Sequence, residues 1–242
     1  EPTTNDNDND TTTTTDTDPL QLIVTSGANQ AYMNCILTLL SDDDTAACVV
    51  FKPYYFNHVM AIQMTRGEAA MRVGPLDEDG VPSVDWLREQ FLADQRRGGG
   101  DRAGRSIQMV TVVNPGNPTG VSIPRAKLQK IVDVCGEFGV WLVMDNTYEQ
   151  FDHTGVNTYT NTATTDDHND VPGFHCFHDP HVLNIFSFSK GYAMAGFRVG
   201  YIAINTTGPK SQDAYRQMLK VQDTIPICAS RISQIAAVGA LE

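Results

Sequence analysis

The sequence predicts an α/β fold in which a mostly parallel β-sheet carries helices on both faces. Short, almost continuously apolar runs rich in valine and isoleucine alternate along the chain with longer stretches of helical periodicity. Strands that are apolar on both sides are typical of a parallel sheet buried between two helical layers. Ligands of such sheets bind beyond the carboxyl ends of the strands, so the segments that follow the strands are the candidate sites.

The expected elements follow one another in a regular order. Apolar runs predict strands, and the stretches between them predict helices because their apolar residues recur every three or four positions. The rhythm continues through the second half of the chain and ends in one long helical stretch. The strands are expected at residues 22–25, 48–51, 107–113, 140–144, 182–186 and 199–204, and the helices at 30–40, 55–64, 83–94, 124–138 and about 210–241.

Two polar segments interrupt this pattern. Residues 1–18 are almost entirely Thr, Asp and Asn, which predicts a disordered acidic low-complexity segment with too little apolar surface to order. Residues 153–180 are rich in Thr, Asn, Asp and His and predict a long polar loop inserted into the domain. Residues 19–242 are then expected to form one large domain.

Composition narrows the class of partner. The formal net charge of -12 and the sequence pI near 4.8 argue against nucleic acid or an anionic membrane surface, and leave small molecules and proteins open. The five cysteines are scattered, odd in number and free of C-x-x-C pairs, which favours reduced thiols over disulfides or a zinc ribbon. No apolar run reaches the length of a membrane span and no signal pattern opens the sequence, so we expect a cytoplasmic protein.

The strongest candidate site is the segment 187–198, which follows the strand predicted at 182–186. A lysine just past a strand end, here Lys190 among serines and glycines, can become desolvated and attack an aldehyde. Arg198 offers a planar guanidinium to a phosphate, and Ser187 can add a hydroxyl hydrogen bond. Taken alone, the segment could equally be a Ser/Gly surface loop with an exposed lysine.

A second candidate group combines a carboxylate, a phenol and an amide. Asp145 ends a buried strand and needs a cationic or hydrogen-bonded partner, which a protonated pyridine nitrogen would provide. Tyr148 could reach a phenolate oxygen on the same ring. Asn117 lies in a loop, residues 114–120, that two prolines and two glycines fix, and its amide could be aimed at the same place. A helix-capping Asp and an ordinary turn are the alternatives.

A third candidate is the turn at residues 25–30, which joins a strand to a helix. The backbone N–H groups of such a turn and the helix N-terminus form an anion site, and the small residues Gly27 and Ala28 let a phosphate approach. After the next strand, Tyr54 and Tyr55 lie at the same edge, where one could stack on a flat ring. A common strand-to-helix turn and core aromatics are the alternatives.

Taken together and in this order, the motifs resemble those of the class I and II aminotransferases of fold type I. The resemblance covers nearly everything from Leu20 to the end of the chain except the polar insertion. Each motif is weak alone, whereas five in the right order are specific. They are Ser26-Gly27-Ala28-Asn29, Pro53-Tyr54-Tyr55, Asn117-Pro118-Thr119-Gly120, Asp145-x-x-Tyr148 and Ser187-x-x-Lys190 with Arg198.

The resemblance implies the large domain of a pyridoxal-phosphate-dependent transferase, with pyridoxal 5'-phosphate as cofactor. It implies Lys190 as the Schiff-base lysine and proton shuttle and Asp145 as the partner of the pyridine nitrogen. Asn117 and Tyr148 would bind the cofactor's phenolic oxygen, and Tyr55 would stack on the ring. Lys190, Asp145 and Tyr148 would be catalytic, and Ala28, Asn29, Ser187 and Arg198 would hold the phosphate.

Within the family, four segments are most similar to the plant and algal aromatic aminotransferases: 49–57, 113–118, 144–149 and 220–229. Those enzymes pair aromatic amino or keto acids with methionine, which implies transamination of such an amino acid with a 2-oxo acid in a homodimer. The family's N-terminal segment and its small C-terminal domain, which bears the arginine for the substrate carboxylate, have no counterpart here. We therefore expect a fragment that is inactive alone.

Two other functions share the same cofactor cradle. A lyase or decarboxylase of this fold differs only in which bond of the substrate is held perpendicular to the ring. A non-catalytic module that binds the cofactor is the other alternative. Five of the six histidines fall in the polar insertion or directly after it, near Cys176, but no pair has the helix or knuckle spacing of metal ligands, so no metal is expected.

Overall fold

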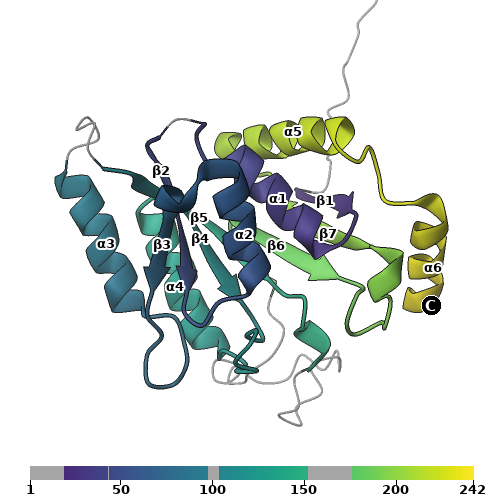
Figure 1. The fold of residues 1–242 in the computed structure, drawn as a ribbon, viewed down its shortest axis with the longest axis horizontal. Coiled ribbons are helices and arrows are strands. Elements are labelled where there is room, and N and C mark those ends of the chain that lie inside the picture. Colours follow the sequence, from purple (N-terminus) through teal and green to yellow (C-terminus); the bar gives the residue numbers. More distant parts are fainter. Residues whose placement is uncertain (1–18, 43, 98–103, 152–175) are drawn as a thin grey trace, which may run out of the picture.

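In the computed structural model the described residues are 19–42, 44–97, 104–151 and 176–242, and they form a seven-stranded sheet between helices (Figure 1). The spatial order is β1-β7-β6-β5-β4-β2-β3. All neighbours are parallel except that β7 runs antiparallel to β1 and β6, which confirms the mostly parallel sheet. The strands are β1 (Leu20–Thr25), β2 (Ala46–Phe51), β3 (Met71–Gly74), β4 (Ser106–Val113), β5 (Trp141–Asp145), β6 (Val182–Ser187) and β7 (Gly200–Asn205).

Helices cover both faces of the sheet, as predicted. One core cluster joins the strands to α1 (Ala28–Leu39), α2 (Phe56–Arg66) and α5 (Pro209–Thr224). The other joins them to α3 (Val84–Arg96) and α4 (Arg125–Glu137). Along β2 successive residues alternate between the two clusters and every one is buried, which is why the strand is apolar throughout.

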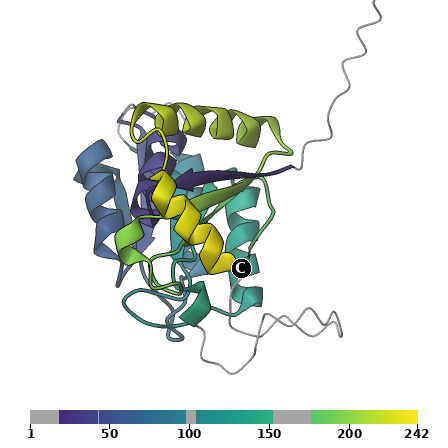
Figure 2. The same ribbon diagram turned by 90° about the vertical axis from the view of Figure 1, so that its right-hand side faces the viewer.

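The prediction of a single long helix at about 210–241 is wrong. The structure has α5 and a second helix, α6 (Arg231–Leu241), separated by a turn at residues 225–230. Pro226 lies in this turn, where its missing N–H and fixed φ end a helix. Figure 1 shows α6 at the right, apart from the other helices and on the side of the sheet that includes β1 and β7, and Figure 2 views the molecule from that side with α6 in front.

The four-residue strand β3 was not expected. It pairs in parallel with β2 at the edge of the sheet. It contains Arg72 and Gly74 and has no continuous apolar run, because an edge strand has one neighbour and less to bury.

Part of the expected polar insertion packs against the core. Phe177 is 3% exposed, and its backbone carbonyl accepts a hydrogen bond of 2.9 Å from the side chain of Asn184 in β6. Residues 1–18 and 152–175 lie outside the described part of the chain, so the disorder of the first segment and the loop within the second stay predictions.

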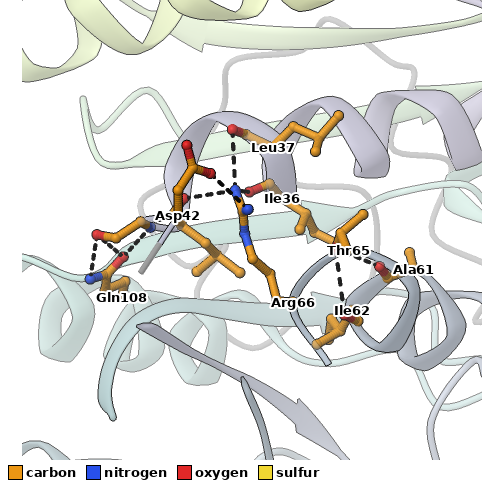
Figure 3. Close-up of polar contacts among 10 residues, drawn as sticks. Ile36, Leu37, Asp42, Ala61, Ile62, Thr65, Arg66 and Gln108 are labelled. Atoms are coloured by element: carbon orange, nitrogen blue, oxygen red, sulfur yellow. Dashed lines mark hydrogen bonds and ion pairs between the residues drawn. The ribbon is translucent and has the colours of Figure 1, made fainter. Parts of the chain in front are cut away.

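Arg66, the last residue of α2, closes the end of α1 (Figure 3). Its Nη2 donates to the carbonyl oxygen of Leu40 at 3.0 Å and to those of Ile36 and Leu37 at 3.5 Å, while Nη1 pairs with Asp42 at 2.7 Å. The carbonyl of Ile36 also accepts the backbone N–H of Leu40 at 3.3 Å. The last carbonyls of a helix lack partners within it, so this arginine supplies a donor to those of Leu37 and Leu40 and fixes α1 to α2. Both helices begin at the candidate site described next.

Candidate active site

A pocket of about 140 Å³ lies beyond the carboxyl ends of the strands, at the edge of the sheet where the sequence placed the chemistry. It brings together all the residues that the sequence singled out as catalytic or cofactor-binding. They are Ala28, Asn29, Tyr55, Asn117, Asp145, Tyr148, Ser187, Lys190 and Arg198. Val113, Thr147, Ser189 and Ala195 complete the lining.

Asp145 supplies a buried negative charge to the pocket. It is the last residue of β5 and is 4% exposed. Burial alone would raise the pKa of its carboxyl. The hydrogen bond and charge of His58, 3.0 Å from Oδ2, together with the backbone N–H of Thr147, 3.0 Å from Oδ1, instead hold this pKa below its ordinary value. The carboxylate is therefore kept ionised where it can pair with a cation.

His58 is the functional residue that sequence reasoning missed. It lies in the first turn of α2 and is 3% exposed. Its ring is packed between Tyr32, with centroids 4.0 Å apart, and Tyr55, 5.2 Å away and nearly perpendicular. The available signal was the position of His58 one helical turn after Tyr55, far in the chain from the other five histidines at residues 153–181.

The amide and the phenol predicted to act together meet in the pocket. Asn117 donates from Nδ2 to the hydroxyl oxygen of Tyr148 at 3.2 Å. The loop that carries Asn117 is closed by a hydrogen bond of 2.8 Å from the backbone N–H of Ile123 to the side chain of Asn114. The two groups together present donors for one oxygen atom of a ligand.

Positive charge gathers at the opposite end of the pocket. The guanidinium of Arg198 donates to the hydroxyl of Ser189 at 3.1 Å and to the carbonyl of Ala195 at 2.9 Å. It packs over Gly27, where a Cβ would lie 2.8 Å from the guanidinium carbon. Gly27 has φ +85° and immediately precedes α1, so the arginine and the helix N-terminus share one anion site.

Gly200 in β7 lets this anion site form beside the sheet. A Cβ at this position would lie 2.7 Å from the carbonyl oxygen of Phe186 and 3.0 Å from the backbone nitrogen of Ala28. A side chain here would therefore push the first residue of α1 away from the strands.

Lys190 lines the pocket and is exposed. The described residues do not desolvate its amine, so the desolvated lysine stays a prediction. Its Nζ lies 5.7 Å from the centroid of the Tyr148 ring. The amine is accessible in a pocket that Asp145 and Arg198 also line.

The candidate metal ligands form no centre in the described residues. No group of three His, Cys, Asp or Glu side chains there could hold an ion, and His153, His168 and His175 lie outside that part of the chain. No helix among the described residues is both long and apolar enough to cross a bilayer.

The fold and the pocket together define the large domain of a fold-type-I aminotransferase. Residues 8–242 match the family described as aminotransferase class I and II, and the chain belongs to this family. Enzymes of the family depend on pyridoxal phosphate. The pocket fits that cofactor, since its lining combines a buried carboxylate with a guanidinium beside a helix N-terminus.

Particular relatives refine the likeness. The chain is 41% identical, over 92% of its length, to the aromatic aminotransferase ISS1 of Arabidopsis thaliana, of which it covers 49%. It is 25% identical to the solved aspartate aminotransferase of Thermotoga maritima, with a TM-score of 0.68 and coverage of 91% of this chain and 50% of that one. The aromatic aminotransferase from Pyrococcus horikoshii OT3, at 23% identity and a TM-score of 0.68, shares the fold. The chain spans about half the length of these relatives.

Proposed function

We propose that the protein transfers an amino group from an amino acid to a 2-oxo acid, with pyridoxal phosphate held at Lys190. The observation that carries the proposal is the pairing of a buried, His58-supported carboxylate with an exposed lysine and an arginine–helix anion site in one pocket. When bound, the cofactor supplies an electron sink for the bonds at the substrate's α-carbon.

Different residues of the pocket would bind different parts of the cofactor. Asp145 would hold a proton on the pyridine nitrogen, because its carboxylate stays ionised beside His58. Asn117 and Tyr148 would bind the phenolic oxygen, and Tyr55 would stack on the ring. The phosphate would be held by Ala28, Asn29, Ser187 and Arg198.

Lys190 would have two tasks. Its amine would bind the cofactor covalently, and once freed by the substrate amine it would move the proton of the substrate's α-carbon. The exposure of Lys190 and the 5.7 Å between its Nζ and the centroid of the Tyr148 ring support both tasks, since the amine is accessible and close to the proposed ring site.

For the substrate we propose an aromatic amino acid or methionine. The support is the 41% identity to a relative named an aromatic aminotransferase, against 25% to one named an aspartate aminotransferase. Steady-state kcat/KM values with tryptophan, phenylalanine, methionine and aspartate as donors test this. A preference for aspartate would contradict it.

A homodimer in the cytoplasm is also proposed. Apolar side chains of α6 that are more than half exposed support association of two copies: Ile232, Ile235, Val238 and Leu241. All five cysteines are free, as thiols remain in a reducing compartment. Sedimentation of the protein and imaging of a fluorescent fusion of its complete reading frame test the two statements.

Borohydride reduction in the presence of pyridoxal phosphate tests the central assignment. The expected result is a cofactor adduct on the peptide that contains Lys190, absent in Lys190→Ala. An adduct on another lysine would contradict the assignment. Release of ammonia or carbon dioxide in place of amino transfer would identify the lyase or decarboxylase alternative.

A further inference from the structure

Three side-chain amides join the first turns of α1 to α5. Gln30 Oε1 accepts the backbone N–H of Ser26 at 2.6 Å, and Gln30 Nε2 donates to Gln222 Oε1 at 2.8 Å. Asn34 Nδ2 donates to the same oxygen at 3.0 Å. Asn34 is fully buried and Gln222 is 7% exposed, so losing any of these partners would leave a costly unpaired amide.

The hydrogen bonds run in one direction. The N–H of Ser26 can only donate, so the oxygen of Gln30 must face it and the nitrogen must face Gln222. The nitrogen of Gln222 is thereby turned to the carbonyl of Ile227, 3.4 Å away. Flipping any one amide would place donor against donor or acceptor against acceptor.

The far end of this chain of hydrogen bonds is a strained turn. Ile227 has φ +65°, a conformation that β-branched residues rarely adopt. Its backbone N–H donates to the carbonyl of Gln222 at 2.9 Å, so Gln222 contacts both polar groups of the Ile227 backbone. The Ile227 side chain is 68% exposed, so side-chain packing does not explain the strain, which the surroundings must maintain.

The near end is the anion site. Ser26 directly precedes Gly27, over which Arg198 packs, and the next two residues, Ala28 and Asn29, line the pocket. Fixing the N–H of Ser26 fixes the peptide that leads into this loop, residues 26–29.

We propose that Gln30 and Gln222 are positioning residues that couple the loop at residues 26–29 to the turn at residues 225–230. Anion binding at the loop and the left-handed conformation of Ile227 then stabilise each other, because coupling between two sites is reciprocal. The proposal rests on the proposed function in one respect, namely that the loop receives the cofactor's phosphate.

Hydrogen exchange on the complete chain tests the coupling. Exchange of the backbone amides at residues 225–230 is measured without ligand, with inorganic phosphate and with pyridoxal phosphate. We expect both ligands to slow this exchange in the wild-type protein and not in Gln222→Leu. Gln212→Leu makes the same change at an exposed position of α5 and should behave as the wild type.

The affinities for pyridoxal phosphate and for pyridoxal distinguish a positioning role of Gln222 from a purely structural one. Gln222→Leu should bind pyridoxal phosphate roughly tenfold more weakly. Pyridoxal, which lacks the phosphate, should bind equally to the wild type, Gln222→Leu and Gln212→Leu. If pyridoxal affinity falls as much as that of the phosphate ester, Gln222 is merely structural and the proposal is wrong.

Other outcomes are equally decisive. If neither ligand slows exchange at residues 225–230 in the wild type, the coupling does not exist.

Gln222→Glu is the second variant, for use if Gln222→Leu does not fold. Its carboxylate keeps the oxygen that Gln30 and Asn34 need but cannot donate to the carbonyl of Ile227. Phosphate should then no longer slow exchange at residues 225–230. If phosphate slows exchange but no adduct forms on Lys190, the coupling stands and the proposed function fails.

Discussion

At the scale of single residues, the negative charge of Asp145 in the pocket is supported by His58, which belongs to none of the sequence motifs. Asp145 and Lys190 could be found from the sequence because each directly follows or ends an apolar strand. His58 acts through a contact between α2 and β5, two elements distant in the chain, and no local pattern encodes which buried side chain will face Asp145. Desolvation of Lys190 likewise has no local pattern, since it depends on what covers the loop.

The carboxyl of Asp145 should respond to removal of its partner. In His58→Phe burial is no longer opposed by the imidazole, so the pKa of Asp145 should rise. With its pKa below the ordinary value, wild-type Asp145 stabilises the fold at neutral pH, and this contribution is lost as pH falls through the folded pKa. Carbon NMR titration of labelled aspartate checks it, with Asp145→Asn to assign the signal. An unchanged pKa would mean that other groups hold the charge.

Glu149 should give a pH dependence of stability opposite to that of Asp145. Burial raises the pKa of its carboxyl to about 7. The folded state then binds the proton more tightly than the unfolded state, so the free energy of unfolding should fall as pH rises from about 4.3 to 7. Urea unfolding across this range should show a smaller fall in Glu149→Gln. The exposed Glu89→Gln is the control, and equal slopes in both variants would contradict the prediction.

Arg198 should not tolerate lysine. Nη1 of Arg198 donates to both Ser189 and Ala195 while Nη2 and the guanidinium carbon pack over Gly27. Lysine could donate to Ser189 and Ala195 but has no planar group to leave a second nitrogen over Gly27. We expect Arg198→Lys to weaken pyridoxal phosphate binding by on the order of tenfold with its charge retained, whereas pyridoxal binds as before. Fluorescence titration measures both affinities, and equal cofactor affinity would make Arg198 structural.

At the scale of elements, the sequence located six strands and the helices between them because their apolar periodicity is strong. The predictions failed for elements whose bounds do not depend on apolar periodicity. β3 is a short edge strand with little to bury, and the break between α5 and α6 depends on Pro226 and on the left-handed Ile227. Ile227 is hydrogen-bonded to Gln222, whose side chain is held by Gln30 and Asn34 of α1. Apolar spacing along the chain does not record that tertiary contact.

The cap on α1 should contribute measurably to stability. Arg66→Met keeps much of the side chain but removes the donor to the carbonyls of Leu37 and Leu40, and should lower the free energy of unfolding by about 1–3 kcal/mol. Arg88→Met removes an exposed pair with Glu137 and should lower the free energy of unfolding much less. Urea unfolding of both variants gives the comparison, and equal losses would show that the cap is unimportant.

At the scale of the whole molecule, the described residues supply the cofactor's surroundings more completely than the substrate's. The pocket is lined by one arginine, Arg198, which is engaged at the anion site beside α1. Arg216 on α5 and Arg231 on α6 do not line it. No second guanidinium in the described lining is free to orient the carboxylate of an amino acid, although the proposed reaction needs the bond at the α-carbon to be held in place.

We therefore predict that these 242 residues, expressed alone, bind pyridoxal phosphate at Lys190 but transaminate far more slowly than the relatives of about twice their length. Positioning of a substrate can be worth on the order of 7–11 kcal/mol of barrier, so losing even part of it lowers kcat by orders of magnitude. The exposed apolar residues of α6 should also make the chain self-associate, which Ile232→Lys with Ile235→Lys should reduce. Single-turnover transfer from methionine or tryptophan, together with sedimentation, measures both effects. Rapid turnover that Lys190→Ala abolishes would show that a carboxylate site exists within these residues.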